Sequence, residues 1–399
     1  MNKFHIYIIT CLLFLVSCMG SKKDKAVDDI LAKGKIDPKL VPASVGYVPV
    51  QPFFTGFSHP VDIVMGFDEL LYVVDDKGLN ILDQAGRLQQ TIYIPGATDV
   101  TQDRRLHTYV AGRVNIIVGG QTKNVAAVYH LINMATGNYQ IIDTLIHPYC
   151  DGTRGSSFSA LDEQVKFTGL ACTAGNVLYV ARTGPTPDNP PAIADNNVLI
   201  FDKDGNNSGY ATGLSPNSPS LKSVMGLSSI ATFAAPPQRV FGINPNPDFL
   251  VTQGEPSQAI EFRALWIKQF NDPDLGIVYS ENTSLLSFDN SKASSYLYKP
   301  NRFENPSDVY IAGDQNAYIF VVDASKDSLF QFTARGYEGV NPPANYGSNK
   351  QIFASFGGKG QGLFNFDEPS GVCYYKRMVF VADKNNNRIC RFKLSTDLE

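Results

Sequence analysis

The chain has 399 residues, 43% of them hydrophobic, so it can bury a large core and is not disordered as a whole. Its 34 Lys and Arg against 38 Asp and Glu give a net charge of -4, without the basic excess that nucleic-acid binding needs. Only 18% of the residues are charged, whereas 19 Tyr and 25 Phe accompany a single Trp, which favours a β-rich protein. We therefore expect no nucleic-acid partner.

Residues 1–17 are predicted to be a lipoprotein signal peptide. Lys3 supplies a positive charge, and the mainly apolar run from Phe4 to Val16 is too short to span about 30 Å of hydrocarbon as a helix. The run ends in Leu15-Val16-Ser17-Cys18, which resembles the bacterial lipobox, in which the cysteine is lipidated before cleavage. Cys18 is thus the predicted lipid-attachment residue of a bacterial, membrane-anchored protein. An ordinary secretory signal is the alternative.

Residues 18–46 are predicted to form a flexible tether, because they are polar, contain no aromatic residue and cannot bury a core. The following domain, residues 47–399, is then expected on the extracytoplasmic side of the cell envelope. We expect anchoring to the outer membrane in preference to the inner one. No later apolar run approaches about 18 residues, so no transmembrane helix is expected.

Four cysteines remain after lipidation of Cys18, namely Cys150, Cys172, Cys373 and Cys390. None forms a C-x-x-C pair, and with only four mature histidines a structural zinc site has little support. Cys172 and Cys373 occupy similar places in two repeats and are interpreted as small core residues. A disulfide between Cys150 and Cys172 is left open.

The domain repeats one strand pattern. Each copy has an inner strand, an apolar second strand, a turn and a third strand. Three copies are clear, and they begin with His59-Pro60-Val61-Asp62-Ile63, with Asn305-Pro306-Ser307-Asp308-Val309 and with Pro369-Ser370-Gly371-Val372-Cys373. Three degraded copies lie between the first two of these, so the six inner strands are expected to begin near residues 60, 97, 167, 228, 306 and 369.

The last copy, with Phe356-Gly357-Gly358-Lys359-Gly360 before it and Asn387 to Phe392 after it, resembles the NHL repeat in order and spacing. The resemblance implies an all-β, six-bladed β-propeller. The excess over about 40 residues per blade is assigned to loops. Seven blades, with one hidden between Ser228 and Pro300, is the alternative.

A propeller ring needs closure, because an open edge strand leaves backbone groups unpaired. Few residues follow the last repeat, whereas Tyr47 to Phe53 precedes the first. We therefore predict that this N-terminal segment supplies the outer strand of the last blade, where its prolines are tolerated.

Asp62, Asp99 and Asp308 share one repeat position at the start of an inner strand, beside the central channel. Three converging carboxylates could hold calcium, and the resemblance to gluconolactonase-like and paraoxonase-like propellers implies a metal-dependent hydrolase or lyase as one alternative. The other is that each Asp caps backbone N–H groups where its strand begins. Other copies carry Gly169, Ser228 and Gly371 here. His59 lies near the same channel mouth and could act as an acid or base.

Two further Asp patterns are interpreted as structural. Asp75, Asp323 and Asp383 end second strands, and Asp383 is expected to pair with Arg388. The segment 202–206 lacks the remaining EF-hand spacing and is predicted to be an Asp-Gly hairpin turn. No phosphate-binding loop, nucleophile elbow or zincin motif occurs.

Four aromatic residues in loops rich in Gly, Asn and Pro are candidates for ligand binding, namely Tyr337, Tyr346, Phe364 and Phe366. Flat rings beside amides suit a sugar or a protein partner; packing within their own loops is the alternative. The sequence therefore predicts a membrane-anchored binding module for a glycan or an envelope protein, in preference to an enzyme.

Overall fold

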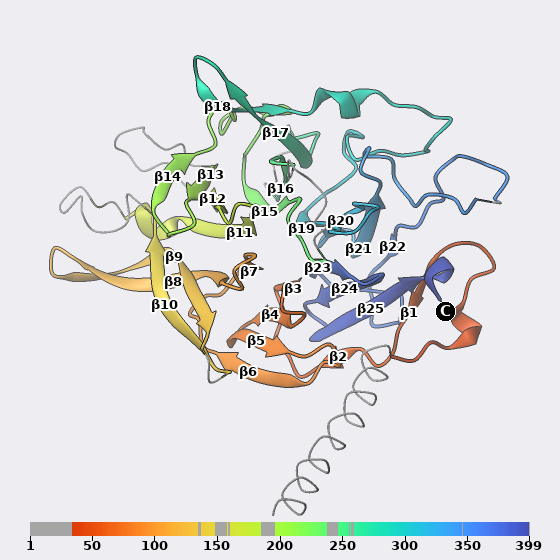
Figure 1. Cartoon of the computed structure of the whole chain (residues 1–399), viewed down its shortest axis with the longest axis horizontal. Helices are drawn as coiled ribbons and strands as arrows, with labels where there is room; N and C mark the ends of the chain where they lie inside the picture. The colour runs from red at the N-terminus through yellow and green to blue at the C-terminus, as the bar shows by residue number, and fades with distance from the viewer. Residues whose placement is uncertain are drawn as a thin grey trace, which may run out of the picture.

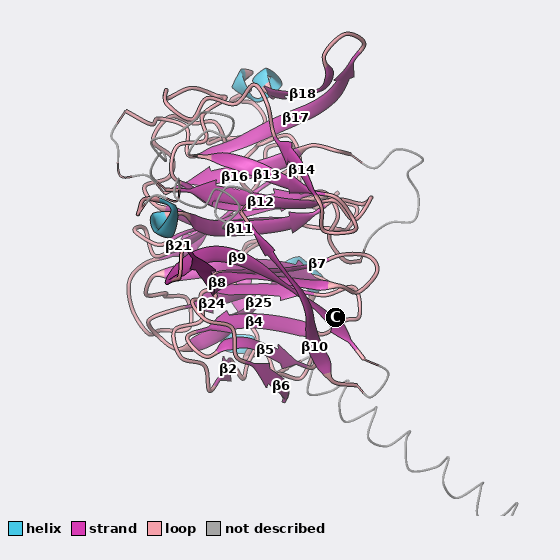
Figure 2. Ribbon diagram, turned by 90° about the vertical axis from the view of Figure 1, so that its left-hand side faces the viewer, coloured by secondary structure: helices cyan, strands magenta, loops and turns pink. Residues whose placement is uncertain are grey.

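A computed structural model of the chain describes residues 34–134, 137–147, 158, 160–184, 196–237, 246–254, 256, 259–344 and 346–398. These residues form six antiparallel sheets that follow one another round a ring in chain order, which confirms the predicted six-bladed β-propeller (Figure 1). Figure 2 shows the blades from the side. Within the described part of the chain, no helix is long and apolar enough to cross a membrane. Its 3-10 turns are η1 (Pro38–Leu40), η3 (Asp162–Gln164), η4 (Thr283–Leu286) and η5 (Ser395–Asp397).

Each blade runs from an inner strand at the central axis to an outer strand at the rim. Blade 1 contains β3 (Asp62–Met65), β4 (Leu71–Asp75), β5 (Gly78–Leu82) and β6 (Leu88–Ile92). Blade 2 contains β7 (Asp99–Gln102), β8 (Thr108–Val118), β9 (Gln121–Asn133) and β10 (Tyr139–Ile146). Blade 3 contains β11 (Lys166–Cys172), β12 (Leu178–Thr183), β13 (Asn197–Phe201) and β14 (Asn207–Tyr210).

The remaining blades follow the same plan. Blade 4 contains β15 (Leu227–Thr232), β16 (Phe249–Gln253), β17 (Ala264–Asp272) and β18 (Gly276–Glu281). Blade 5 contains β19 (Pro306–Ile311), β20 (Ile319–Asp323), β21 (Ser328–Phe332) and β22 (Phe356–Gly357). Blade 6 contains β23 (Pro369–Tyr375), β24 (Met378–Asp383) and β25 (Arg388–Leu394), and β1 (Tyr47–Pro49) and β2 (Phe54–Thr55) complete it.

The N-terminal segment closes the ring as predicted. β1 pairs antiparallel with β25, with Tyr47 opposite Leu394, and β2 pairs with the other end of β25, with Phe54 opposite Ile389. The outer position of β1 accommodates Pro49, because the missing N–H of a proline costs little at a sheet edge. Blade 6 is therefore built from both ends of the domain.

The middle strands are buried along their whole length. Every residue of β4, β5 and β20 is buried, because each sheet is covered on both faces by the neighbouring blades. Side chains from adjacent blades form the core; Phe320 of blade 5, for example, stacks on Tyr374 of blade 6 with ring centroids 5.3 Å apart.

The structure corrects two details of the repeat. Residues 227–281 form the single sheet of blade 4, so there is no seventh sheet among the described residues of that region. Part of the excess length of blade 2 lies in its strands, because β8 and β9 have 11 and 13 residues and form one long hairpin. The predicted turn at Asp202 is confirmed, since the Gly205 N–H donates to the Asp202 carbonyl at 3.0 Å.

Candidate functional site

The six inner strands begin on one face of the ring, which we call the entry face. Near the start of five of them a Ser or Thr hydroxyl donates a hydrogen bond to a backbone carbonyl of the next blade. These bonds join Thr98 to Phe167 (2.8 Å), Thr168 to Leu227 (2.8 Å), Ser228 to Pro306 (2.6 Å), Ser307 to Pro369 (2.6 Å) and Ser370 to Pro60 (2.7 Å). Blade 1 has Val61 at this position. This ring of hydrogen bonds was not predicted, although the recurring hydroxyl position is visible in the sequence.

Asp62, Asp99 and Asp308 occupy the next position of the repeat, and each ties its own blade to the next one. Their carboxylates accept hydrogen bonds from the N–H groups of Val100 (2.8 Å), Leu170 (2.8 Å) and Val372 (2.7 Å), respectively. Asp308 also accepts the N–H of Val309 at 2.7 Å, in its own strand. The carboxylates thus cap backbone N–H groups, mainly across blade junctions and not within a local turn.

The other three blades carry small residues at this position. The equivalent residue in blade 4 is Ser229 and not Ser228, since Ser229 pairs with Thr252 as Asp308 pairs with Val322. The Ser229 hydroxyl donates to Oδ1 of Asp308 at 2.6 Å. A Cβ atom at Gly169 would lie 2.8 Å from the backbone of Ser229 and Ile230, so the close approach of the next blade requires glycine.

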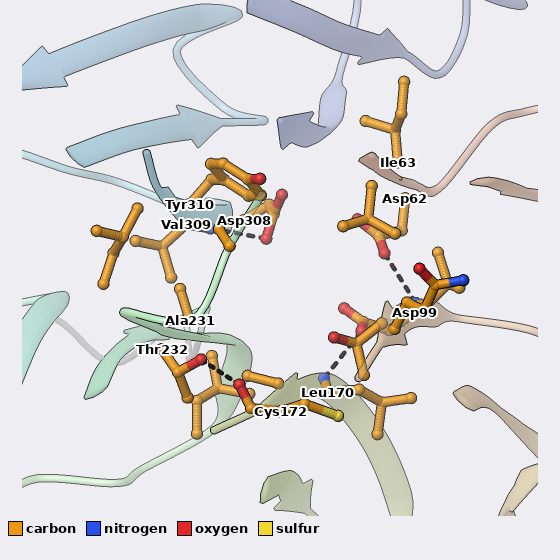
Figure 3. A pocket seen from close by; sticks show the side chains of 18 of the residues that line it. Asp62, Ile63, Asp99, Leu170, Cys172, Ala231, Thr232, Asp308, Val309 and Tyr310 are labelled. Carbon is orange, nitrogen blue, oxygen red and sulfur yellow. Dashed lines mark hydrogen bonds between the residues drawn. The ribbon is translucent and has the colours of Figure 1, made fainter. Parts of the chain in front are cut away.

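The inner strands surround a central cavity with about 540 Å³ of space between the lining atoms, part of it open to solvent (Figure 3). The three aspartates lie in its wall among mainly aliphatic side chains, and Tyr310, Thr101, Gln102 and Thr232 add polar groups. The segment Ala234 to Pro236 lines it as well. Cys172 is a free, buried thiol in the same wall.

The cavity makes ionisation of its carboxyl groups unfavourable. Burial raises the pKa of Asp62 to about 6, although the N–H groups of Val100 and Ile63 partly stabilise its anion. Burial also raises the pKa of Asp99 and of Asp308, and repulsion from Asp62 raises both further. No described residue that lines the cavity is Lys, Arg or His, so no cation of the described wall offsets this charge.

The three aspartates line one cavity, but the described residues contain no group of three or more His, Cys, Asp or Glu side chains placed to hold a metal ion. His59 lies outside the cavity lining. Nδ1 of His59 is 2.8 Å from Oδ2 of Asp76, and the backbone N–H of His59 donates to Oδ1 of Asn387 at 2.7 Å. The structure therefore brings Asp62, Asp99 and Asp308 to one cavity, whereas His59 is exposed outside that cavity.

Two histidines that the sequence did not connect lie together in blade 2. Nε2 of His130 is 2.9 Å from Nδ1 of His107. Burial lowers the pKa of both imidazoles, that of His130 to about 4. In blade 3, Arg182 stands at the second-strand position that Asp323 occupies in blade 5. Its side chain is buried, and its Nε donates to Nε2 of His147 at 3.0 Å.

The cysteines and the strand-ending aspartates behave largely as structural residues. Cys373 lies one position earlier in its strand than Cys172, and both are buried free thiols, as is Cys390. Cys150 and Cys18 lie outside the described residues. The predicted pair is confirmed, since Nε of Arg388 donates to Oδ2 of Asp383 at 2.7 Å. Asp75 and Asp323 accept N–H groups of the preceding connection.

Two adjoining concavities on the entry face span blades 4, 5 and 6, and we call them together the entry groove. They hold about 1080 and 1330 Å³ of space between protein atoms, part of it open solvent. They share Glu304, Asn305 and Ser325. The first is also lined by Ser307, Ala324, Asp327, Lys359, Glu368, Ser370 and Lys384, and the second by Gly254, Pro256, Ile260, Arg263, Asn301, Phe303 and Lys326. Most of the lining side chains are thus charged or polar.

The four candidate loop aromatics lie outside the entry groove and do not form one surface. Phe366 is fully buried and packs on Phe356 and Phe392, so its ring has no face open to a ligand. Phe364 is partly buried against the same core, and Tyr337 packs edge-on against Tyr296. Tyr346 alone of the four is exposed, at 47%. The Gly, Asn and Pro content of these loops predicted exposed aromatic rings. Contacts with strands distant in sequence bury the ring of Phe366 instead.

The sequence matches no known family profile and no curated protein. Solved structures with similar folds include an auxiliary nutrient binding protein from Bacteroides ovatus (10% identity, TM-score 0.48, covering 90% of this chain and 75% of that one). They also include the PQQ-bound aldose sugar dehydrogenase of Streptomyces coelicolor (11% identity, TM-score 0.48, covering 88% of this chain and 99% of that one). A third is a gluconolactonase from Xanthomonas campestris (10% identity, TM-score 0.45, covering 90% of this chain and 94% of that one). At these identities the similarity concerns the fold alone, and the NHL resemblance remains one of repeat pattern.

Proposed function

We propose that this chain is a binding module, anchored to the cell envelope through Cys18, that holds a glycan in the entry groove. The observation that carries the proposal is the chemistry of the groove lining. Glu304 and Glu368 are exposed acceptors, Lys359 and Lys384 are donors, and Asn305 is both. Sugar hydroxyls donate and accept hydrogen bonds, so a row of mixed partners suits an oligosaccharide better than an apolar ligand.

Binding is favoured over catalysis because the conspicuous carboxylates of the chain already have structural partners. Asp62, Asp99 and Asp308 each accept a backbone N–H from the next blade. His59, the candidate acid or base, is held by Asp76 on the rim. A hydrolase or lyase would need a nucleophile or ligand set at one point, and these contacts support an interaction platform instead.

A glycan array screened with the full chain in non-ionic detergent tests the proposed ligand class. The matched variant is Lys359→Gln with Lys384→Gln, which replaces two charged ammonium donors with neutral amides. The ion pairs of these lysines, to Asp367 at 3.4 Å and Glu368 at 3.5 Å, are exposed and add little stability. We expect at least about a tenfold loss of affinity for the oligosaccharide selected by the array.

Lys203→Gln, in the hairpin turn on the opposite face, is the control and should bind as the unaltered chain does. The proposal fails if no oligosaccharide binds, or if the groove variant and the control bind equally. If the chain retains an envelope protein and binds no glycan, the entry groove is a site for a protein partner.

The anchor is tested separately. Cells grown with an alkyne fatty acid should label the unaltered chain, and Cys18→Ser should remove the label and release the protein from the membrane fraction. Label that persists in Cys18→Ser would place the lipid elsewhere.

A further inference from the structure

The central cavity has a function of its own beyond the proposed glycan site: we propose that it binds a small primary ammonium ion, such as a short alkylamine. The cavity lies on the propeller axis, separate from the entry groove, and Asp62, Asp99 and Asp308 contribute to it from three different blades. Figure 3 shows the three carboxyl groups facing the same space.

An unpartnered hydroxyl marks the cavity as a ligand site. Tyr310 is only 8% exposed, and its hydroxyl has no hydrogen-bond partner among the described residues. Figure 3 shows the phenol beside Asp308 in the cavity wall. A buried hydroxyl without a partner is costly to a folded protein, and a ligand that bonds to it recovers that cost.

The charge of the cavity defines the ligand further. Asp99 uses one carboxylate oxygen for the Leu170 N–H, and its second oxygen has no hydrogen-bond partner in the described chain. No described lining residue is basic, which agrees with the raised pKa of all three aspartates. A cationic ligand would supply the missing countercharge and favour the ionised carboxylates.

A primary ammonium ion fits the remaining features better than calcium does. It is a compact charge with three N–H donors, enough for two carboxylates and the Tyr310 oxygen. Aliphatic side chains such as Ile63, Leu170 and Val309 line the space in which an alkyl group would lie. Calcium requires six to eight oxygen ligands, whereas backbone N–H groups already occupy one oxygen of Asp62 and both of Asp308.

The test is isothermal titration calorimetry of the full chain in non-ionic detergent at pH 8 with ethylammonium chloride. Three non-hydrogen atoms limit the affinity, so we expect saturable binding with a Kd of about 1–10 mM. Tetraethylammonium carries the same charge without N–H donors and should not bind. Absence of saturable ethylammonium binding up to ~100 mM, equal binding of tetraethylammonium, or displacement by ~1 mM calcium would each overturn the proposal.

Two variants assign the binding to the cavity. Asp99→Asn should weaken ethylammonium about tenfold, because it replaces a charge-assisted hydrogen bond with a neutral one. Tyr310→Phe removes only an unpartnered hydroxyl, so it should fold and bind about threefold to tenfold more weakly. Asp204→Asn, in the exposed turn of blade 3, is the control. If Tyr310→Phe binds ethylammonium as tightly as the parent, the site is not the central cavity. This outcome decides the question even if the Asp99→Asn protein does not fold.

Discussion

The hydroxyl of Tyr47 donates a 2.7 Å hydrogen bond to Oε1 of Gln331, so the strand that closes blade 6 is also fastened to blade 5. Both side chains are buried, and Nε2 of Gln331 has no partner among the described residues. Among the described residues, the bond from Tyr47 is thus the one hydrogen bond made by this buried side-chain amide.

Tyr47→Phe should lower the free energy of unfolding by about 1–3 kcal/mol, because it leaves the buried Gln331 oxygen without its donor. Urea denaturation followed by intrinsic fluorescence measures the change. Tyr93→Phe is the control, since Tyr93 is 72% exposed and should change stability by less than about 0.5 kcal/mol. Equal losses in the two variants would show that the bond adds nothing.

Val61→Thr should stabilise the protein by up to about 1 kcal/mol, since it places a hydroxyl at the one blade junction that lacks it. Threonine keeps the branched shape of valine, and the five existing bonds show that the next carbonyl is within reach at this position. Ser307→Ala should lose about the same amount. A Val61→Thr protein less stable than the parent would contradict this account of the ring.

Gly169→Ala should destabilise the fold by about 1–3 kcal/mol or more, because the added methyl group would lie 2.8 Å from backbone atoms of blade 4. Gly175→Ala in the same blade is the matched control, with its nearest neighbour 3.8 Å away. The midpoints of thermal unfolding compare the two. Similar midpoints would mean that blades 3 and 4 can separate slightly at no cost.

The contribution of Asp62 to stability should fall as the pH rises from about 4 to about 7. Burial raises its pKa from 3.8 to about 6, so the folded protein holds a proton that the unfolded chain has already released. The stability contributed by the protonated form is complete below pH 3.8 and is lost as the pH rises through the folded pKa.

Asp62→Asn keeps an acceptor for Val100 but cannot ionise. It should therefore gain about 1–3 kcal/mol over the parent at pH 8 and little at pH 4, in urea titrations at the two pH values. The exposed Asp204→Asn serves as the control. A gain that is the same at both pH values would mean that ionisation of Asp62 is not its source.

The repeat and its closure could be predicted because they depend on local patterns. The inner strands begin at 62, 99, 166, 227, 306 and 369, within two residues of the expected positions, since turns and apolar runs are coded locally. The register of one repeat against another depends on strand pairing and not on local pattern, and the structure places Ser229, not the predicted Ser228, at the position of Asp308. The difference of one residue matters, because the Ser228 hydroxyl donates to the Pro306 carbonyl, whereas the Ser229 hydroxyl donates to the Asp308 carboxylate.

The site was harder to predict because its features arise between blades. Composition could not show that Phe366 packs on strands of blades 5 and 6, or that Tyr310 lacks a partner. The entry groove combines residues from the connections of three blades, none of which is unusual alone. Shared repeat position did indicate that Asp62, Asp99 and Asp308 would lie beside the central channel, and all three line its cavity.

The pairing of Tyr47 with Leu394 sets the order in which the molecule can be assembled. β1 precedes every other strand of the described ring in the chain, yet its partner β25 follows all of them. Blades 1 to 5 can form while synthesis continues, but β1 must wait for almost the whole chain. A product that stops short of β25 would leave blade 6 incomplete and the ring open, so β25 acts as a check on synthesis of the complete ring.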